Sequence, residues 1–175
     1  MLPDRALCLS TVTSIINAPI EKIDIADWLF TLPDPEYQRC AHAHIAAGTT
    51  TTDDGRPMMV TTEMVSDVMI QHWVAEVREP GHCRMVSISD AITAGGRTKV
   101  QAVWELSAKK IDDRTCEYRN TLSAAATDEF LAFIQKNGIT MEQAKAPRQA
   151  ALDLHNREET PNYAKSIERR ALQRS

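Results

Sequence analysis

Residues 68–92 read VMIQHWVAEVREPGHCRMVSISDAI, and this stretch decides the fold. Two runs rich in Val, Ile and Met lie on either side of the turn sequence Glu79-Pro80-Gly81, which predicts two strands joined by a short turn. Similar turn sequences stand before and after this stretch, at residues 53–55, 94–96 and 112–114. Links this short leave no room for crossover helices, so the strands are predicted to form an antiparallel meander.

Working outward from this meander, the pattern predicts seven strands, near residues 8–17, 45–52, 57–66, 68–78, 83–92, 97–109 and 115–124. Proline signals predict two short helices between the first and second strands, near residues 20–30 and 35–44. After the last strand the chain becomes helical, with a break at Asn137-Gly138 and a long helix over about 140–173, which Pro147 and Pro161 could kink. The expected order is β-αα-β6-α, an α+β class with a strongly curved sheet, in a single domain spanning 1–175.

The composition excludes several function classes. The chain has 175 residues, of which 43% are hydrophobic, enough to bury one core. Its formal net charge of -4 provides no positive field for a phosphate backbone, so nucleic acid is not an expected partner. The four cysteines form no CxxC pair, and no uncharged stretch reaches membrane-spanning length, so we expect no membrane partner. These features predict a cytoplasmic protein in a reducing compartment, and they are compatible with a homo-oligomer.

The segment LDLHNREETPNYAKSI, residues 152–167, carries the most informative polar groups. On a helix, Leu152, His155, Glu159, Tyr163 and Ile167 lie along one stripe. An imidazole and a carboxylate four residues apart on one face can both reach a single cation. The alternative is an exposed ion pair on a solvated helix. Residues 156–158 already supply a polar face, which favours an interior position for His155 and Glu159.

Two further segments place ionisable groups near a predicted interior. In the strand over 68–78, His72 and Glu76 share one face with three apolar residues, because side chains alternate along a strand. If this face points inward, Glu76 and His72 enter a cavity; the alternative leaves Glu76 in water near the strand end. In CAHAHIAAG, His42 and His44 are two residues apart, so at most one of them faces the interior. A lone His at such a junction can also be a structural hydrogen-bonding residue.

The predicted order of elements resembles the helix-grip superfamily, which includes START domains, proteins of the birch-pollen-allergen type and bacterial polyketide cyclases. This resemblance covers nearly the whole chain. It implies a curved antiparallel sheet wrapped around the long C-terminal helix. It also implies a cavity between sheet and helix that takes a small apolar or aromatic ketone ligand.

A narrower resemblance concerns four residues. His44 in AHI, Glu76 in HWVAEV and the pair His155 and Glu159 are similar to the zinc ligands of the diacetylphloroglucinol hydrolase and phloretin hydrolase enzymes. This resemblance implies a Zn²⁺ site, with Fe²⁺ or Mn²⁺ as less favoured metals. It also implies metal-assisted hydrolysis of a carbon–carbon bond in a ketone or polyketide-like aromatic substrate.

Three other residues are candidates for catalytic roles. His72 is a candidate general acid or base, while Tyr37 and Tyr163 are candidate hydrogen-bond donors to substrate oxygens. The alternative for each is a cavity-lining or surface position. Two other functions stay open: a metal-free polyketide cyclase or aromatase that uses His72 and the tyrosines, and a non-catalytic binder of a small apolar ligand.

Overall fold

A computed structural model describes residues 3–173 of the chain. Its first strand, β1 (Ala6–Ile16), lies between two short 3-10 turns, η1 (Pro3–Arg5) and η2 (Ile20–Lys22), and is followed by α1 (Ile25–Phe30) and α2 (Asp34–Gln38). The remaining strands are β2 (His44–Thr51), β3 (Pro57–Val65), β4 (Asp67–Glu79), β5 (His82–Thr93), β6 (Gly96–Lys110) and β7 (Cys116–Ala126). Two helices, α3 (Asp128–Lys136) and α4 (Met141–Gln173), complete the described chain.

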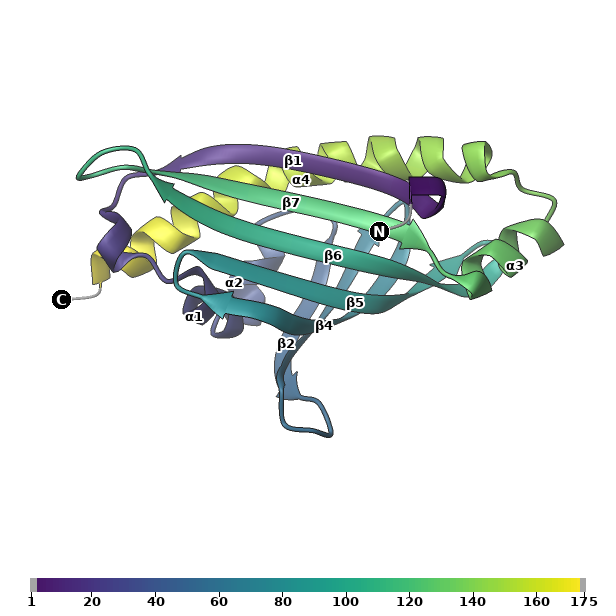
Figure 1. Cartoon of the computed structure of the whole chain (residues 1–175), viewed down its shortest axis with the longest axis horizontal. Helices are drawn as coiled ribbons and strands as arrows, with labels where there is room; N and C mark the ends of the chain where they lie inside the picture. Colours follow the sequence, from purple (N-terminus) through teal and green to yellow (C-terminus); the bar gives the residue numbers. More distant parts are fainter. Residues whose placement is uncertain (1–2, 174–175) are drawn as a thin grey trace.

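The seven strands form one antiparallel sheet in the order β1-β7-β6-β5-β4-β3-β2. The predicted meander is therefore confirmed, and β1 is the one strand that joins the far side of the sheet, beside β7. Strands β1, β7 and β6 pass in front of the long helix α4 in Figure 1, and the β2–β3 hairpin projects from the body of the molecule. This is the predicted α+β helix-grip arrangement.

The helices differ in detail from the sequence prediction. Helix α1 has six residues and α2 has five, both shorter than expected. Because α2 ends at Gln38, the chain has room for a turn before His44, which begins β2 rather than ending a helix. The predicted break at residues 137–138 is present, with Gly138 at a φ of 65°. Helix α4 continues through Pro147 and Pro161 as one element.

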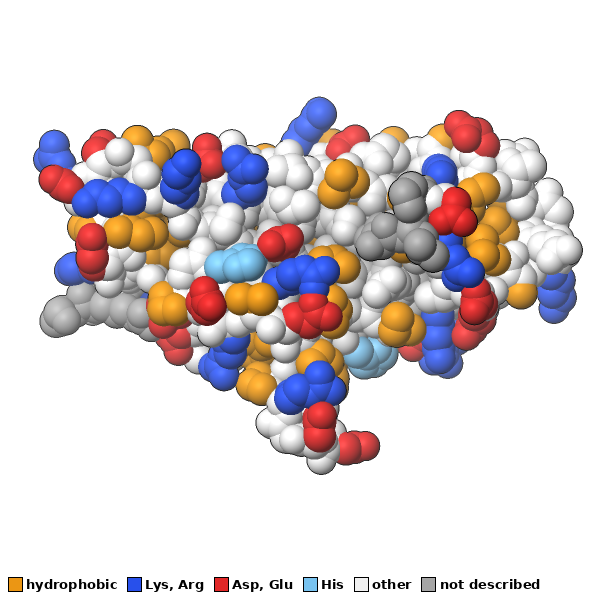
Figure 2. All heavy atoms as spheres, in the orientation of Figure 1, with side chains coloured by type: hydrophobic (Ala, Val, Ile, Leu, Met, Phe, Trp, Pro, Cys, Tyr) orange, Lys and Arg blue, Asp and Glu red, His pale blue; other side chains and the backbone are white. Residues whose placement is uncertain are grey.

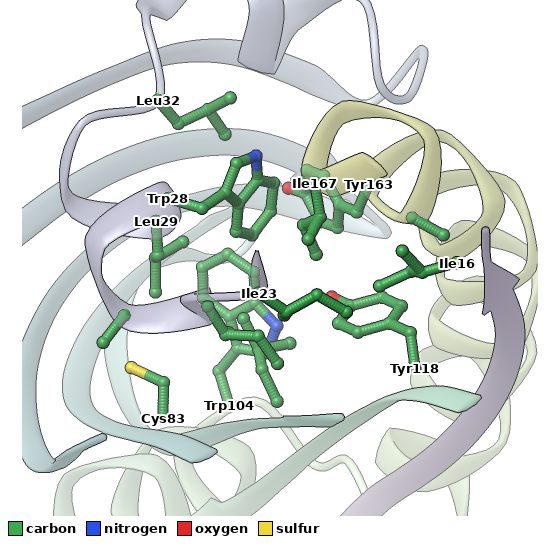
Figure 3. Close-up of a cluster of buried hydrophobic side chains, with 14 of the residues drawn as sticks. Ile16, Ile23, Trp28, Leu29, Leu32, Cys83, Trp104, Tyr118, Tyr163 and Ile167 are labelled. Atoms are coloured by element: carbon green, nitrogen blue, oxygen red, sulfur yellow. The ribbon is translucent and has the colours of Figure 1, made fainter. Parts of the chain in front are cut away.

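The hydrophobic core is divided into two clusters along α4. The larger cluster packs α1 and the C-terminal half of α4 against the sheet, and Figure 3 shows Trp28, Tyr118 and Ile167 converging there. The indole nitrogen of Trp28 donates to the Ser166 hydroxyl over 2.8 Å, which ties α1 to α4. The smaller cluster joins α3 and the start of α4 to the other end of the sheet, around Phe130. Space between these two clusters is available for a cavity.

Helix α4 also covers the open edge of β1. The Gln149 side chain accepts a hydrogen bond from the Leu9 backbone N–H over 3.0 Å and donates one to the Leu9 carbonyl over 2.8 Å. Further along, the Glu168 carboxylate accepts from the Asn17 backbone N–H over 2.8 Å. These side chains satisfy backbone groups that an edge strand otherwise leaves to water or to another chain. The face of the sheet seen in Figure 2 instead carries interspersed acidic, basic and hydrophobic side chains.

We predict that Gln149→Ala lowers the free energy of unfolding by about 1–2 kcal/mol, because two hydrogen bonds to the β1 edge are lost. Urea unfolding followed by circular dichroism measures the change. Arg157→Ala, on the exposed side of the same helix, is the control and should change stability by less than about 0.5 kcal/mol. Equal effects of the two substitutions would contradict this role for Gln149.

Candidate metal centre

Four ionisable side chains converge in the interior between the sheet and α4. His44 begins β2, Glu63 lies on β3, and His155 and Glu159 lie one turn apart on α4. His44 and Glu63 are direct cross-strand partners in the β2–β3 pairing, which places their side chains together. All four residues are buried, with exposed fractions of 7% or less. We call this set the His44–Glu63–His155–Glu159 cluster.

The ligating atoms of this cluster lie close to one another. Atoms offered by His44, Glu63 and His155 are all within 4.8 Å of each other. The Oε2 atom of Glu159 lies 3.2 Å from Nε2 of His44 and 3.4 Å from Nε2 of His155. The Oε2 atom of Glu63 lies 3.8 Å from Nε2 of His155. The ligating atoms of His44, Glu63 and His155 therefore form a group of three, and the Glu159 carboxylate lies against both imidazoles of that group.

The protonation of His44 follows from its partners. Its Nδ1 lies 2.6 Å from the backbone carbonyl oxygen of Tyr37, and a carbonyl oxygen can only accept, so Nδ1 carries the proton. The Tyr37 ring stacks on the imidazole with centroids 3.9 Å apart and holds its plane. Nε2, which lies 3.2 Å from Oε2 of Glu159, is then the atom of His44 that would bind a cation. Such a hydrogen bond from the far nitrogen is typical of metal-binding histidines.

The charges of the cluster are strongly coupled. Burial alone would lower the pKa of His155, but the carboxylates of Glu159 and Glu63 raise this pKa to about 9. Burial alone would raise the pKa of Glu159, but His155 and His44 lower this pKa to about 2. Two buried carboxylates facing two imidazoles need positive charge between them, supplied either by protons or by a cation.

A divalent metal ion fits this donor set. A tetrahedral zinc ion with bonds of 2.0–2.1 Å has neighbouring ligand atoms about 3.3 Å apart. The contacts of 3.2 and 3.4 Å between Glu159 and the two imidazoles match that spacing, and the ligating atoms of His44, Glu63 and His155 lie within 4.8 Å of one another. Two neutral imidazoles and two carboxylates would also balance the charge of a divalent ion. Imidazole and carboxylate ligands suit Zn²⁺ and also accommodate Fe²⁺ and Mn²⁺.

The cluster lies at the wall of an apolar cavity. Glu63 and His155 both line this cavity, as do Gln71 and Trp73 of β4. Most of the remaining lining is apolar and comes from both core clusters and the strands between them, including Leu7, Met69, Val100, Ala102, Leu122 and Leu152. A small ligand in this space would have its apolar part enclosed and a polar group beside the cluster.

The structure does not bring Glu76 to the cluster, which corrects the prediction of Glu76 as a metal ligand: of the two possible faces of β4, the one that carries Glu76 points outward. The side chains of Gln71 and Trp73 are buried, so Glu76, on the alternate face, points outward. Glu76 lies at a bulge in the β4–β5 pairing, its side chain is 49% exposed, and it forms an ion pair with Arg84. The carboxylate that β3 contributes, Glu63, stands in the cluster instead.

The three predicted catalytic residues have different surroundings. His72 shares the outward face of β4 with Glu76 and does not line the cavity. Tyr37 is fully buried, and its hydroxyl donates a hydrogen bond to Oε1 of Glu63. The Tyr163 hydroxyl lies 3.5 Å from Nε2 of His44. Both tyrosines thus contact the cluster, and they do so from outside the cavity lining.

Sequence reasoning missed Glu63 and two amides that hold the carboxylates. The Asn120 side chain donates to Oε1 of Glu159 over 2.8 Å, and the Gln71 side chain donates to Oε2 of Glu63 over 3.2 Å. One signal for Glu63 was present: it is the only charged residue within the predicted strand over 57–66. Asn120 and Gln71 carry no such signal, because buried amides look like surface amides in a sequence.

Comparison with solved structures shows the fold. A START superfamily protein from Mycobacterium smegmatis matches over 95% of this chain and 99% of its own, with 12% identity and a TM-score of 0.53. The ZhuI aromatase/cyclase from Streptomyces sp. R1128 matches over 95% of this chain and 94% of its own, with 11% identity and a TM-score of 0.61. The chain therefore has a START-like helix-grip fold.

A third solved structure is, like the second, an aromatase/cyclase. The di-domain aromatase/cyclase StfQ from the steffimycin biosynthetic pathway matches over 98% of this chain and 52% of its own, with 9% identity and a TM-score of 0.61. No protein-family model matches the sequence. No curated protein matches it either.

Within residues 3–173, none of the helices is long and apolar enough to cross a membrane.

We predict that the metal-free protein is stabilised most by the His155–Glu159 pair between pH 4.5 and 6.5. Because the pKa of His155 rises from 6.5 to about 9 on folding, its contribution is complete below pH 6.5 and is lost as pH rises through 9. Because the pKa of Glu159 falls from 4.5 to about 2, its contribution is complete above pH 4.5 and is lost as pH falls through 2.

Thermal unfolding of chelator-treated protein across this pH range measures the effect. His155→Gln should be less stable than the unsubstituted protein at pH 6, and the difference should shrink toward pH 9. A stability difference that stays constant from pH 6 to pH 9 would contradict the coupling.

Proposed function

We propose that this chain is a metal-dependent enzyme that acts on a small, largely apolar carbonyl compound of the polyketide-like aromatic type. The observation that carries the proposal is the buried group of His44, Glu63 and His155, with Glu159 against both imidazoles, beside an apolar cavity that Glu63 and His155 line. Burying four ionisable groups costs free energy, because each loses its hydration. Clusters of this kind are therefore found mainly at functional sites. The START-like fold supports a cavity ligand as its partner.

The proposed reaction is hydrolysis of the carbon–carbon bond between an acyl group and an aromatic ring. Water adds its oxygen to the acyl carbon and a proton to the ring carbon, so the products are a carboxylic acid and the deacylated ring. A divalent metal ion, when bound, polarises a carbonyl oxygen and lowers the pKa of water. Zn²⁺ is the proposed cofactor, and Fe²⁺ or Mn²⁺ would be less favoured.

The residues of this chain would perform the remaining tasks. Nε2 of His44 and Nε2 of His155 would hold the metal together with oxygens of Glu159 and Glu63. The Tyr37 carbonyl and ring keep the His44 imidazole in its binding orientation. Apolar side chains around the cavity would enclose the ring of the ligand and exclude bulk water, which strengthens electrostatic interactions at the carbonyl.

A metal-free cyclase or aromatase is the second candidate function. It is favoured by the comparisons, since two of the described solved structures are aromatase/cyclases. In this reading His155, whose pKa is raised to about 9, holds a proton at neutral pH and could donate it beside the cavity. The Glu159 carboxylate, whose pKa is lowered to about 2, would then carry the negative charge beside the imidazolium.

We predict that the purified protein binds about one equivalent of Zn²⁺. His155→Ala and Glu159→Ala should each weaken this binding by at least about 100-fold, because each removes a ligand. Glu76→Gln is the control and should bind zinc like the unsubstituted protein, since Glu76 is on the opposite face of the sheet. Competition with a chromophoric chelator measures these affinities. Loss of zinc in Glu76→Gln with retention in Glu159→Ala would contradict the assignment.

A second prediction concerns activity on acylated polyhydroxy-aromatic ketones. Zinc-loaded protein should release the carboxylic acid and the deacylated ring, detected by liquid chromatography with mass spectrometry. Chelation should abolish the release, and added Zn²⁺ should restore it. Ring closure of a poly-β-ketone by exhaustively chelated protein would instead establish the metal-free cyclase.

A further inference from the structure

Each carboxylate of the cluster stands at the end of a chain of buried hydrogen bonds that begins at an indole. In the first, Trp104 Nε1 donates to Asn120 Oδ1 over 2.9 Å, and Asn120 Nδ2 donates to Oε1 of Glu159 over 2.8 Å. We call this the Asn120 chain. Asn120 is fully buried on β7, and neither Trp104 nor Asn120 lines the cavity.

The second chain of hydrogen bonds, on β3 and β4, also runs from an indole N–H through a side-chain amide to a carboxylate. Trp73 Nε1 donates to the Thr61 hydroxyl over 3.0 Å, and this hydroxyl donates to Gln71 Oε1 over 2.5 Å. Gln71 Nε2 then donates to Oε2 of Glu63 over 3.2 Å. We call this the Gln71 chain. Two separate parts of the sheet thus present an amide N–H to a carboxylate of the cluster.

The direction of both chains is set by chemistry. An indole nitrogen can only donate, so the atom of Asn120 that faces Trp104 must be its oxygen. The amide nitrogen of Asn120 must then face Glu159. In the same way, Thr61 accepts from Trp73 and gives its own proton to the Gln71 oxygen, which leaves the Gln71 amide nitrogen toward Glu63. Neither amide can turn over without breaking a hydrogen bond at each end.

We infer that Asn120 and Gln71 are positioning residues of the metal centre, an inference that rests on the proposed function. Asn120 occupies Oε1 of Glu159, so Oε2, the atom beside both imidazoles, is left for the metal. Glu159 would then offer the metal a single oxygen. Gln71 acts on Glu63 in a different way, because it donates to Oε2, the oxygen that lies 3.8 Å from Nε2 of His155. The Tyr37 hydroxyl donates to Oε1, so the two hydrogen bonds fix the plane of the Glu63 carboxylate and leave the second lone pair of Oε2 for the metal.

A purely structural role would predict different behaviour. If Asn120 only satisfied buried hydrogen-bonding groups, its loss would destabilise the fold and leave the coordination of a bound metal unchanged. If it positions Glu159, its loss frees Oε1, and the carboxylate can rotate or bind through both oxygens. The coordination geometry would then change in protein that is still folded.

The test uses Zn²⁺ affinity and the visible absorption spectrum of the Co²⁺-substituted protein, which reports ligand number and geometry. Asn120→Leu should weaken Zn²⁺ binding by about 10–100-fold and alter the Co²⁺ spectrum. Tyr118→Phe is the matched control. Tyr118 shares the inward face of β7 with Asn120, is fully buried, and has a hydroxyl with no hydrogen-bond partner among the described residues. Its substitution should leave both the affinity and the spectrum unchanged.

Two further variants complete the design. Trp104→Phe keeps an aromatic ring but removes the donor that orients Asn120, so it should weaken binding less than Asn120→Leu while altering the spectrum in the same direction. Gln71→Met should do the same through Glu63. If Asn120→Leu does not fold, the affinity and spectrum of Trp104→Phe test whether Asn120 positions Glu159.

The outcomes separate this inference from the proposed function. If the unsubstituted protein binds no metal, the proposed metal centre fails, and the positioning roles fail with it. If the unsubstituted protein binds Zn²⁺ and folded Asn120→Leu, or Trp104→Phe in its place, matches its affinity and Co²⁺ spectrum, the positioning role alone is overturned.

Discussion

The burial of the Glu159 carboxylate is the constraint on which the arrangement of the molecule depends. A charged carboxylate that is 2% exposed loses its hydration and must regain it from neighbouring groups. Here the neighbours come from three separate elements: His44 from β2, Asn120 from β7 and His155 from α4 itself. The placement of α4 across the sheet is therefore set by polar contacts as well as by packing.

This constraint explains the polar character of the buried face of α4. Besides His155 and Glu159, the residues Asn156, Thr160 and Ser166 are buried there. The Thr160 hydroxyl donates to the Asn156 carbonyl, and Ser166 accepts from Trp28. A helix held only by hydrophobic burial would need a wide apolar stripe. The buried apolar residues of α4 lie mainly toward its C-terminal end, where Ile167 and Ala171 join the larger core cluster.

Most of the fold could be predicted from the sequence because its signals are local. Turn residues at regular spacing mark the strand ends, and short links allow only antiparallel neighbours. The helix lengths between β1 and β2 were harder to predict, because proline marks where a helix begins and carries no information about where it ends. The inward stripe of α4 was also predictable, since His155, Glu159 and Tyr163 recur at helical spacing, and all three are buried.

The sequence predicted Glu76 of β4 in the cluster, whereas the structure has Glu63 of β3 there, and the reason for this error is physical. Both faces of β4 carry apolar side chains, so alternation alone cannot say which face is inside. The outward face carries Val68, Ile70 and Val74, a pattern typical of a core face, although all three side chains are only partly buried. The pairing of His44 with Glu63 depends on the β2–β3 register, which no local pattern in either strand reveals. Buried amides such as Asn120 become recognisable only once their partners are known.

The cross-strand pairing of His44 and Glu63 requires an exact register at one end of the β2–β3 hairpin but sets no requirement on the length of the loop at the other end. Side chains alternate between faces, so a slip of one residue in the register would turn one of the two away from the interior. The loop over residues 52–56 lies at the far end, where it projects from the body of the molecule. A change in the length of that loop leaves the pair in place, whereas a single deletion between the loop and the pair, in residues 46–51 or 57–62, would shift the register and separate His44 from Glu63.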